Sequence, residues 1–426
     1  MALQGPRTVG KSTLLAEVAG WHGAAVVDLD DPVVRDAVAA DPATFVSGPP
    51  PVCIDEFQRA PVVLDAIKSE LNRRLAPGRF VITGSTRFDA LPRAAQALTG
   101  RIHIIDLLPL SQGEMEGRRE DFLEVAAAEP GAVVGRSRQA ATRADYVERI
   151  CRGGLPLAVA RSGSSRARWF DDYVRVSLAR DVTELSKVRQ GALLPALLRR
   201  LAAQTGQVLN MASAGRSAGL EPRTAEAYTG LLEDLFLVRR LHAWGRTLRS
   251  RASAYPKIHV GDSGLAARLL GVTPQRMSRP DPAALAEFGH LLETFVVGEL
   301  LRQASWSGEV AAVGHWRTHD GQEADLVIEH RDGSVLAFEV KAGARIDRRD
   351  ARGLRALRGA LGDAFTAGFV LHTGRLAYHL DDRIIAAPID TLWTAPHGAT
   401  GAPPKPPPVA RLDEVLAELD EARRDR

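Results

Sequence analysis

Cysteine is nearly absent from the sequence, with two residues in a chain of 426. A disulfide framework is therefore excluded, and we expect a reducing compartment. No apolar segment approaches the ~20 residues that span a bilayer, and the first residues do not form a signal peptide, so we expect a cytoplasmic protein without membrane contacts. A large net charge is also lacking, because 55 Lys and Arg residues face 52 Asp and Glu residues. The chain as a whole is no polycation.

The remaining composition is that of a globular protein, with 45% hydrophobic and 25% charged residues. At about 150 residues per domain, the length predicts two or three domains. Short apolar runs at 24–29, 52–54 and 80–83 are separated by helix-like segments at 12–19 and 62–75. This alternation predicts an α/β fold, with a mainly parallel sheet covered by helices on both faces.

Further along the chain the pattern changes to helices and then to a second α/β block. Leucines from 193 to 201 recur at helical spacing, and helix-like segments follow at 211–218 and from Pro222, before a strand-like run at 237–241. This order resembles a winged helix-turn-helix. We predict five parts: an α/β domain (1–130), a helical connector (131–190), a winged-helix-like region (191–275), a second α/β domain (283–395), and a Pro-rich linker with a C-terminal helix (396–426).

A glycine-rich loop matches GxxxxGK[ST] without a gap and opens a predicted helix. Its backbone N–H groups and the positive end of that helix are suited to bind phosphate. Lys11 would reach the β- and γ-phosphates of ATP, and Ser12 would bind Mg²⁺. A chance glycine-rich turn is the alternative. The predicted nucleotide-binding residues are Gly5, Pro6, Arg7, Thr8, Val9, Gly10, Lys11, Ser12 and Thr13.

Two carboxylates end the apolar strand that begins at Val52. Ligands of open α/β sheets bind at the carboxyl ends of the strands. Asp55 would hold Mg²⁺ through water, and Glu56 would polarise the attacking water. The polar residues 83–85 could sense the γ-phosphate, or form a plain turn. Arg101 could stabilise transition-state charge as an arginine finger, in cis or from a neighbour, or be an ordinary surface arginine.

The phosphate-binding loop lacks the usual preceding strand, because only four residues precede Gly5. A typical strand has about 5–6 residues. We therefore expect either that the true start lies upstream or that the first strand is weakened.

An acidic cluster is predicted in the second α/β block. Asp332-Gly333 is a hairpin turn signal, and a loop centred on Asp332 would place Asp325 opposite Glu339. Lys341 lies two residues from Glu339 and so shares its face of the strand. The two carboxylates could hold Mg²⁺, and the lysine could orient water. Glu293 or Glu299 could add a further acid. A salt-bridged, solvated hairpin face is the alternative.

The order of these motifs resembles a widespread prokaryotic AAA-type ATPase domain, carried by GPRTVGKST, VCIDEFQRAP, FVITGST and GRIHIIDLLPLS. Later segments, among them YVRVSLARDVTEL and EADLVIEHRDGSVLAFEVKAG, resemble the uncharacterised domain that follows this ATPase in many bacterial and archaeal proteins. The resemblance implies a P-loop ATPase, a winged-helix middle part and a restriction-endonuclease-like end. By position, Asp325, Glu339 and Lys341 match the PD-(D/E)xK nuclease triad, with Asp325 and Glu339 as metal ligands.

The winged-helix-like region carries a local excess of positive charge. Residues 191–260 contain ten Lys and Arg residues and four acids. Such a patch in a near-neutral chain is typical of phosphate-backbone binding, and Arg216 and Arg223 flank the start of the predicted recognition helix. A protein-binding winged helix is the alternative.

Three functions follow from these features. The first is a Mg²⁺-dependent ATPase coupled to a DNA-contacting C-terminal region. The second is a metal-dependent nuclease gated by nucleotide, with its centre at Asp325, Glu339 and Lys341. The third is a non-catalytic, nucleotide-dependent interaction module. The sequence leaves the substrate and the oligomeric state open.

Overall fold

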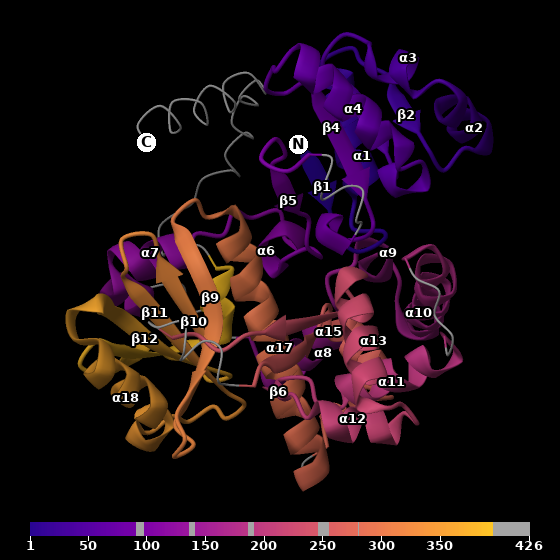
Figure 1. Ribbon diagram of the computed structural model, residues 1–426. Helices are drawn as coiled ribbons and strands as arrows, with labels where there is room; N and C mark the ends of the chain where they lie inside the picture. Colours follow the sequence, from indigo (N-terminus) through magenta and orange to yellow (C-terminus); the bar gives the residue numbers. More distant parts are fainter. Residues whose placement is uncertain (91–97, 136–140, 186–190, 246–254, 280, 395–426) are drawn as a thin grey trace.

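The computed structural model describes the chain except for residues 91–97, 136–140, 186–190, 246–254, 280 and 395–426. The predicted Pro-rich linker and C-terminal helix lie outside the described residues. The described part forms three lobes, with the N-terminal sheet in one, a helical region in the second and a mixed sheet in the third (Figure 1). Among the described residues, no helix is both long and apolar enough to cross a bilayer.

The N-terminal lobe contains a five-stranded parallel sheet in the order β2-β3-β4-β1-β5. Apolar residues of both faces are buried beneath helices, as the predicted α/β fold requires. The elements are β1 (Ala2–Gln4), α1 (Lys11–Trp21), β2 (Val26–Asp28), α2 (Pro32–Ala40), α3 (Pro42–Val46), β3 (Val52–Asp55), α4 (Val62–Arg73), β4 (Phe80–Gly84) and β5 (Ile104–Asp106).

The first strand is shorter than a typical strand. Residues 2–4 do form a strand, and it pairs with β4 on one side and β5 on the other. The strand is short, yet neighbours on both sides supply its hydrogen bonds, and Ala2 and Leu3 are buried. The phosphate-binding loop therefore follows a central strand, as in other sheets that bind ligands at strand ends.

The helical lobe is built around leucine-rich faces and a small antiparallel sheet. Leu194, Leu197, Leu198 and Leu201 are buried in one core. The strands of this sheet lie in the order β6-β8-β7. The elements are α8 (Arg143–Arg152), α9 (Pro156–Val159), α10 (Gly163–Leu185), α11 (Leu194–Ala202), β6 (Gln207–Val208), α12 (Met211–Ser217), α13 (Pro222–Asp234), β7 (Val238–Leu241), β8 (Lys257–Val260), α15 (Ser263–Leu269) and α16 (Pro274–Met277).

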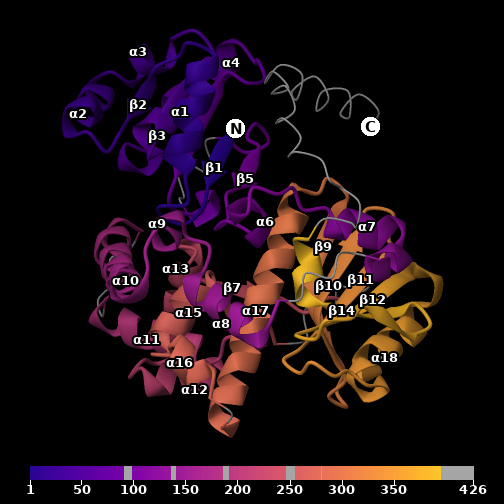
Figure 2. The ribbon, with the colours of Figure 1, turned by 180° about the vertical axis from the view of Figure 1, so that it is seen from behind.

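The third lobe contains a six-stranded mixed sheet in the order β13-β14-β12-β11-β10-β9. The long helix α17 (Pro282–Trp306) runs between this sheet and the helical lobe in both ribbon views (Figure 2). Its apolar residues belong to the same core as those of the helical lobe. The other elements are β9 (Val310–Arg317), β10 (Glu323–His330), β11 (Val335–Lys341), α18 (Arg352–Leu361), β12 (Phe365–His372), β13 (Tyr378–Asp381) and β14 (Ile384–Pro388).

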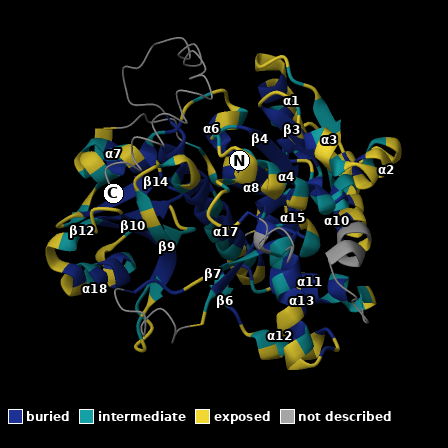
Figure 3. Ribbon diagram, turned by 45° about the horizontal axis from the view of Figure 1, so that its top comes forward, coloured by how far each residue is buried: buried dark blue, intermediate teal, exposed yellow. Residues whose placement is uncertain are grey.

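The chain changes lobes before the predicted boundary at residue 130. α6 (Gln112–Met115) follows β5, and α7 (Phe122–Ala128) packs on the third lobe. The ring of Phe122 lies 6.3 Å from that of Phe338 and 5.4 Å from that of Phe369. The strands β3, β4 and β14 are buried throughout, whereas β2, β5 and β13 are partly exposed. Figure 3 shows exposed faces on the outer helices α2 and α18.

Candidate nucleotide-binding site and acidic cluster

The glycine-rich loop joins the carboxyl end of β1 to the start of α1. Gly10 has φ 106° and Thr8 has φ 62°, so the loop turns through the left-handed region before the helix begins. Gly5 is required by close packing, because a Cβ there would lie 2.1 Å from the carbonyl oxygen of Leu107. The loop therefore has the wrapped conformation that phosphate-binding loops use.

Lys11 points back into this loop. Its side chain is buried, and Nζ donates hydrogen bonds to the carbonyl oxygens of Gly5 at 2.9 Å and Pro6 at 2.8 Å. Ser12 and Thr13 are exposed at the first turn of α1. An ammonium enclosed by the loop and hydroxyl groups beside it form the arrangement that the motif predicts for a nucleotide site.

Asp55 and Glu56 end β3 on the same edge of the sheet. The strand β4 separates β3 from β1, and Thr83 on β4 donates a hydrogen bond to Asp55 Oδ1. The backbone N–H of Glu56 also donates to Oδ1, at 3.0 Å. Within the described residues Asp55 Oδ2 accepts no hydrogen bond. Carboxylate and hydroxyl oxygens are ligands that Mg²⁺ prefers, so Asp55 and Ser12 fit this ion.

Glu56 has an unusual backbone and a perturbed carboxyl group. Its φ is 51°, and Oε2 accepts hydrogen bonds from Gln58 and from Ser85, the latter at 3.3 Å. Burial raises the pKa of Glu56, although Lys11 and Arg7 lie close enough to oppose the rise. The parallel sheet places Glu56 and the loop of Lys11 at one edge, and a carboxylate with a raised pKa is suited to accept a proton.

Arg101 lies elsewhere. It precedes β5, and its guanidinium donates to Asn72, near the end of α4. The N–H of Ala2 bonds the carbonyl of His103, so this segment lies at the amino ends of the strands. The phosphate-binding loop lies at their carboxyl ends, and a role for Arg101 in cis is therefore contradicted. A role toward a neighbouring molecule stays a prediction.

The acidic cluster of the third lobe is present as a group of side chains. The β10–β11 ladder pairs Leu326 with Phe338 and Ile328 with Leu336, a register centred on Asp332. Carboxylate oxygens of Glu323, Asp325 and Glu339 all lie within 4.8 Å of one another. Lys341 Nζ lies 2.6 Å from Glu339 Oε1. Glu339 Oε2 is buried and has no hydrogen-bond partner among the described residues.

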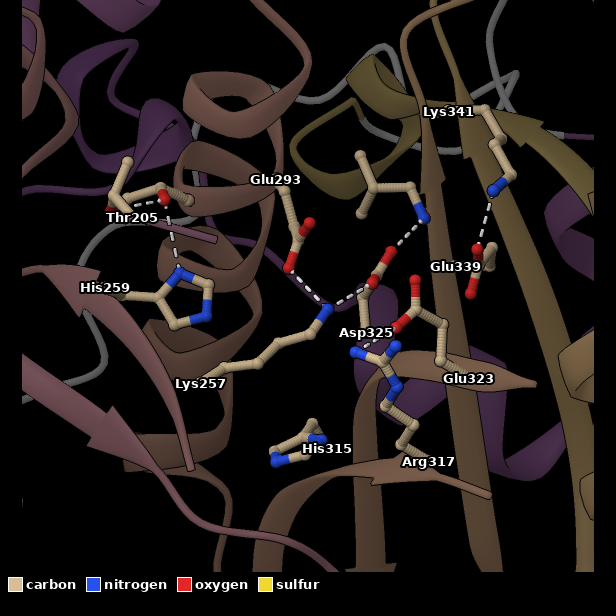
Figure 4. A network of polar contacts seen from close by, with 12 residues as sticks. Thr205, Lys257, His259, Glu293, His315, Arg317, Glu323, Asp325, Glu339 and Lys341 are labelled. Carbon is tan, nitrogen blue, oxygen red and sulfur yellow. Dashed lines mark hydrogen bonds and ion pairs between the residues drawn. The ribbon is translucent and has the colours of Figure 1, made fainter. Parts of the chain in front are cut away.

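Lys257 of β8 enters this cluster from the helical lobe (Figure 4). Its Nζ lies 2.6 Å from Asp325 Oδ1 and 2.8 Å from Glu293 Oε1, with all three side chains almost fully enclosed. Burial acts to raise the pKa of Asp325, but the ammonium of Lys257 holds it below its ordinary value. Burial together with Asp325 raises the pKa of Glu293 to about 8.

Sequence reasoning named Glu293 as a further acid and missed Lys257. The lysine is 68 residues from Asp325, and no local spacing connects them. Glu299, the other acid considered, belongs to a different network, where it accepts hydrogen bonds from Gln112 N at 2.9 Å and Arg302 at 2.8 Å. The acidic cluster therefore contains an internal cation that the hairpin pattern does not reveal.

The basic residues of the region 191–260 divide by burial. Lys257 is buried, Arg240 is paired with Glu226 and Glu233, and three further arginines lie outside the described residues. Arg239 is partly enclosed between lobes. The exposed and described members are Arg199, Arg200, Arg216 and Arg223. Among the described residues, the exposed positive surface of this region therefore rests on these four arginines.

Comparisons with known proteins assign the class of the N-terminal lobe. Residues 1–116 match the family described as "AAA domain". Residues 143–276 match "Domain of unknown function (DUF8612)", and residues 288–392 match "Domain of unknown function (DUF4143)". The chain thus begins with an AAA-type domain, followed by a helical region and a C-terminal α/β domain.

Two mycobacterial proteins resemble the chain over nearly its full length. They are "Uncharacterized protein Rv2008c" of Mycobacterium tuberculosis and "Uncharacterized protein Mb2031c" of Mycobacterium bovis. Each is 29% identical over 420 residues, which cover 98% of this chain and 83% of the relative. A solved structure, protein VC1899 from Vibrio cholerae, aligns over 92% of this chain and 94% of its own, at 12% identity and with a TM-score of 0.20.

Proposed function

We propose that this protein is a Mg²⁺-dependent ATPase whose nucleotide cycle acts on a DNA-contacting C-terminal half. One observation carries the proposal: the loop that encloses Lys11 lies at the same carboxyl edge of the parallel sheet as Asp55 and Glu56. The match of residues 1–116 to an AAA domain supports it. A buried lysine in a glycine-rich loop beside a carboxylate favours phosphate chemistry over a plain turn.

Each residue of the site has a distinct role in this proposal. The backbone N–H groups of the loop bind the phosphates, and Lys11 leaves the carbonyls of Gly5 and Pro6 to contact the terminal phosphate. Mg²⁺, held by Ser12 and Asp55, would neutralise phosphate charge. Glu56 orients the attacking water and accepts its proton, while Ser85 and Gln58 hold the carboxylate in place.

The proposed DNA contact rests on four exposed arginines. Arg216 lies at the end of α12 and Arg223 at the start of α13, on either side of the turn that joins these helices. Arg199 and Arg200 end α11 nearby. In a helix-turn-helix, the second helix of the pair enters the major groove and its first residues reach the bases. Salt-sensitive binding through these side chains is expected.

A nucleotide-gated nuclease is the second candidate, and the approach of Glu323, Asp325 and Glu339 favours it. Lys341, beside Glu339, would orient a water. Lys257 already neutralises part of the negative charge that would attract a divalent ion to these carboxylates. In this alternative, metal binding must compete with an internal ammonium.

ATP turnover measured with and without duplex DNA tests the first candidate. The parent should hydrolyse ATP in the presence of Mg²⁺, and Lys11→Ala should lose ATP binding. Glu56→Gln should retain binding and lose about 100-fold or more in turnover, because the general base is removed. Lys68→Ala and Glu17→Gln, which alter exposed residues of α4 and α1, serve as matched controls.

Four outcomes separate the candidates. If Glu56→Gln turns over ATP as fast as the parent, the assignment of the base is wrong. Loss of DNA stimulation in an Arg216→Gln, Arg223→Gln double variant, with basal turnover kept, supports the DNA contact. Metal-dependent DNA cleavage that Asp325→Ala abolishes supports the nuclease. ATP binding without turnover in the parent indicates an interaction module.

A further inference from the structure

A cavity of about 60 Å³ lies where the three lobes meet. Pro6 of the glycine-rich loop lines it on one side, and residues of β7, β8 and α17 line it on the others. The cavity therefore joins the proposed nucleotide site to the helical region. The volume corresponds to about four water molecules, which is room for one tetrahedral oxyanion.

Three arginines from three parts of the chain surround this cavity. Arg87 follows β4, Arg239 lies on β7, and Arg302 lies on α17. His259 also lines it, but burial lowers the pKa of this imidazole to about 3, so it is neutral. Among the described residues, no Asp or Glu lines the cavity. The charged groups of its wall are therefore the three guanidinium groups, which lie among mostly apolar side chains.

Two of the arginines have fixed partners. Arg302 donates to the carbonyl of Pro109 at 2.6 Å and to Glu299 at 2.8 Å. Arg87 donates to the carbonyl of Glu233 at 3.2 Å, and its guanidinium lies 4.8 Å from the centre of the Phe236 ring. These two side chains hold the lobes together and supply positive charge to the cavity.

Arg239 differs from both. Within the part of the chain that the structure describes, it forms no ion pair. Asp106 and Glu233 are the acids near enough to affect it, but Asp106 accepts a hydrogen bond from Gln4 and Glu233 is held by Arg240. Burial and the charge of Arg87 lower the pKa of Arg239. A partly enclosed guanidinium without a counterion among the described residues is stabilised when an anion joins it.

We propose that this cavity binds a phosphate group and that Arg239 is its principal ligand. The planar fork of a guanidinium matches the oxygens of phosphate, and the bond is charge-assisted. Because Pro6 borders the cavity, the phosphate comes either from the terminal phosphate of bound ATP or from inorganic phosphate after hydrolysis. The proposal deepens the function proposed above and rests on nucleotide binding at the loop.

Such a site makes the helical region sensitive to the state of the nucleotide. Arg239 is carried by β7, which pairs with β8, and β8 carries Lys257 into the acidic cluster. Arg87 joins the residues after β4 to the turn between α13 and β7. A phosphate bound at Arg239 would therefore act directly on the strands that follow the proposed DNA-contacting helices.

The test compares the full chain with Arg239→Gln, Arg239→Lys and the matched control Arg352→Gln, which alters an exposed arginine of α18. Calorimetry measures the binding of ATP, of ADP, and of inorganic phosphate alone and with ADP. If the terminal phosphate enters the cavity, Arg239→Gln should weaken ATP about 10- to 100-fold and leave ADP unchanged. If free phosphate enters the cavity, Arg239→Gln should weaken the binding of phosphate by a similar factor and leave the affinity for ATP unchanged.

Arg239→Lys keeps the charge and should restore part of the lost affinity, whereas Arg352→Gln should change nothing. Equal affinities of the parent and Arg239→Gln for ATP, ADP and phosphate would overturn the proposal. Equal losses for ATP and ADP would also overturn it, because they indicate a structural role. If the parent binds no ATP, the proposed function fails, and the phosphate titration still decides whether the cavity binds an anion.

Discussion

The pKa values of individual carboxyl groups in this protein differ because their surroundings differ. Asp390 is almost fully buried near the end of the described chain, where Oδ2 accepts a hydrogen bond from Ala141 N at 3.0 Å. Oδ1 has no partner among the described residues. Burial outweighs the attraction of Arg149 and raises the pKa of Asp390 to about 6. The folded protein therefore keeps a proton on this group that the unfolded chain loses at lower pH.

Asp390→Asn should stabilise the protein at pH 8 and have little effect near pH 4. The folded pKa lies above the ordinary value of 3.8, so stability falls as pH rises from about 4 to 6. Asparagine resembles the protonated acid and avoids this loss, with a gain of about 1–3 kcal/mol at pH 8. Denaturant unfolding at pH 4 and at pH 8 measures this gain in the free energy of unfolding. The exposed Asp363→Asn is the control, and equal effects at both pH values would contradict the argument.

At the scale of elements, the short strand β1 and the loop after it depend on close packing. Gly5 faces the carbonyl of Leu107, which follows β5 and whose N–H bonds Gln4 O at 2.7 Å. Because the obstacle is backbone, no side-chain rotation can make room for a Cβ. The geometry of the loop is therefore coupled to the position of β5.

Gly5→Ala should disrupt the loop and lower the free energy of unfolding by about 1–3 kcal/mol, since overpacking forces backbone shifts. ATP affinity should fall with it. Gly20→Ala is the matched control, because Gly20 is exposed in α1 with nothing near its Cβ position, and alanine there should stabilise by up to about 1 kcal/mol. Normal ATP binding by Gly5→Ala would show that the loop does not need this packing.

Local patterns predicted many of these elements. The sequence run at 62–75 became α4 over Val62–Arg73, the leucines after 193 form a buried face, and the turn signal at Asp332 set the hairpin register. Period and turn chemistry are local, so they can be read from neighbouring residues. The first strand is only three residues long, and its pairing on both sides could not be read from the local sequence.

These local patterns do not predict the long-range contacts. Arg101 follows a glycine as an arginine finger could, but only the parallel direction of β5 shows that it lies at the opposite edge from Lys11. Arg239 and Arg240 are neighbours on one strand, yet one borders an interlobe cavity and the other is paired with Glu226 and Glu233. Tertiary packing decides between such equivalent residues, and local spacing does not.

At the scale of the whole molecule, Lys257 joins the helical lobe to the third lobe. Its strand belongs to the small sheet, Glu293 belongs to α17, and Asp325 belongs to the large mixed sheet. Buried ion pairs of this kind gain little over apolar packing, but removal of one partner leaves an uncompensated charge. We therefore infer that Lys257 fixes the position of the helical lobe relative to the third lobe, and that it adds little net stability compared with apolar packing.

Lys257→Met should lower the free energy of unfolding by about 3–5 kcal/mol, because Asp325 and Glu293 then face each other without a cation. Addition of millimolar Mn²⁺ should recover more of the melting temperature in Lys257→Met than in the parent, since the metal replaces the lost positive charge at these carboxylates. Lys341→Met, which removes a half-buried ammonium from the same cluster, should cost less. If Mn²⁺ stabilises the parent and Lys257→Met equally, the ammonium and the metal do not share a site. In that case, removal of the metal by EDTA should not change the difference between the melting temperatures of the parent and Lys257→Met. If the metal and the ammonium compete for one site, this difference should become larger when the metal is removed.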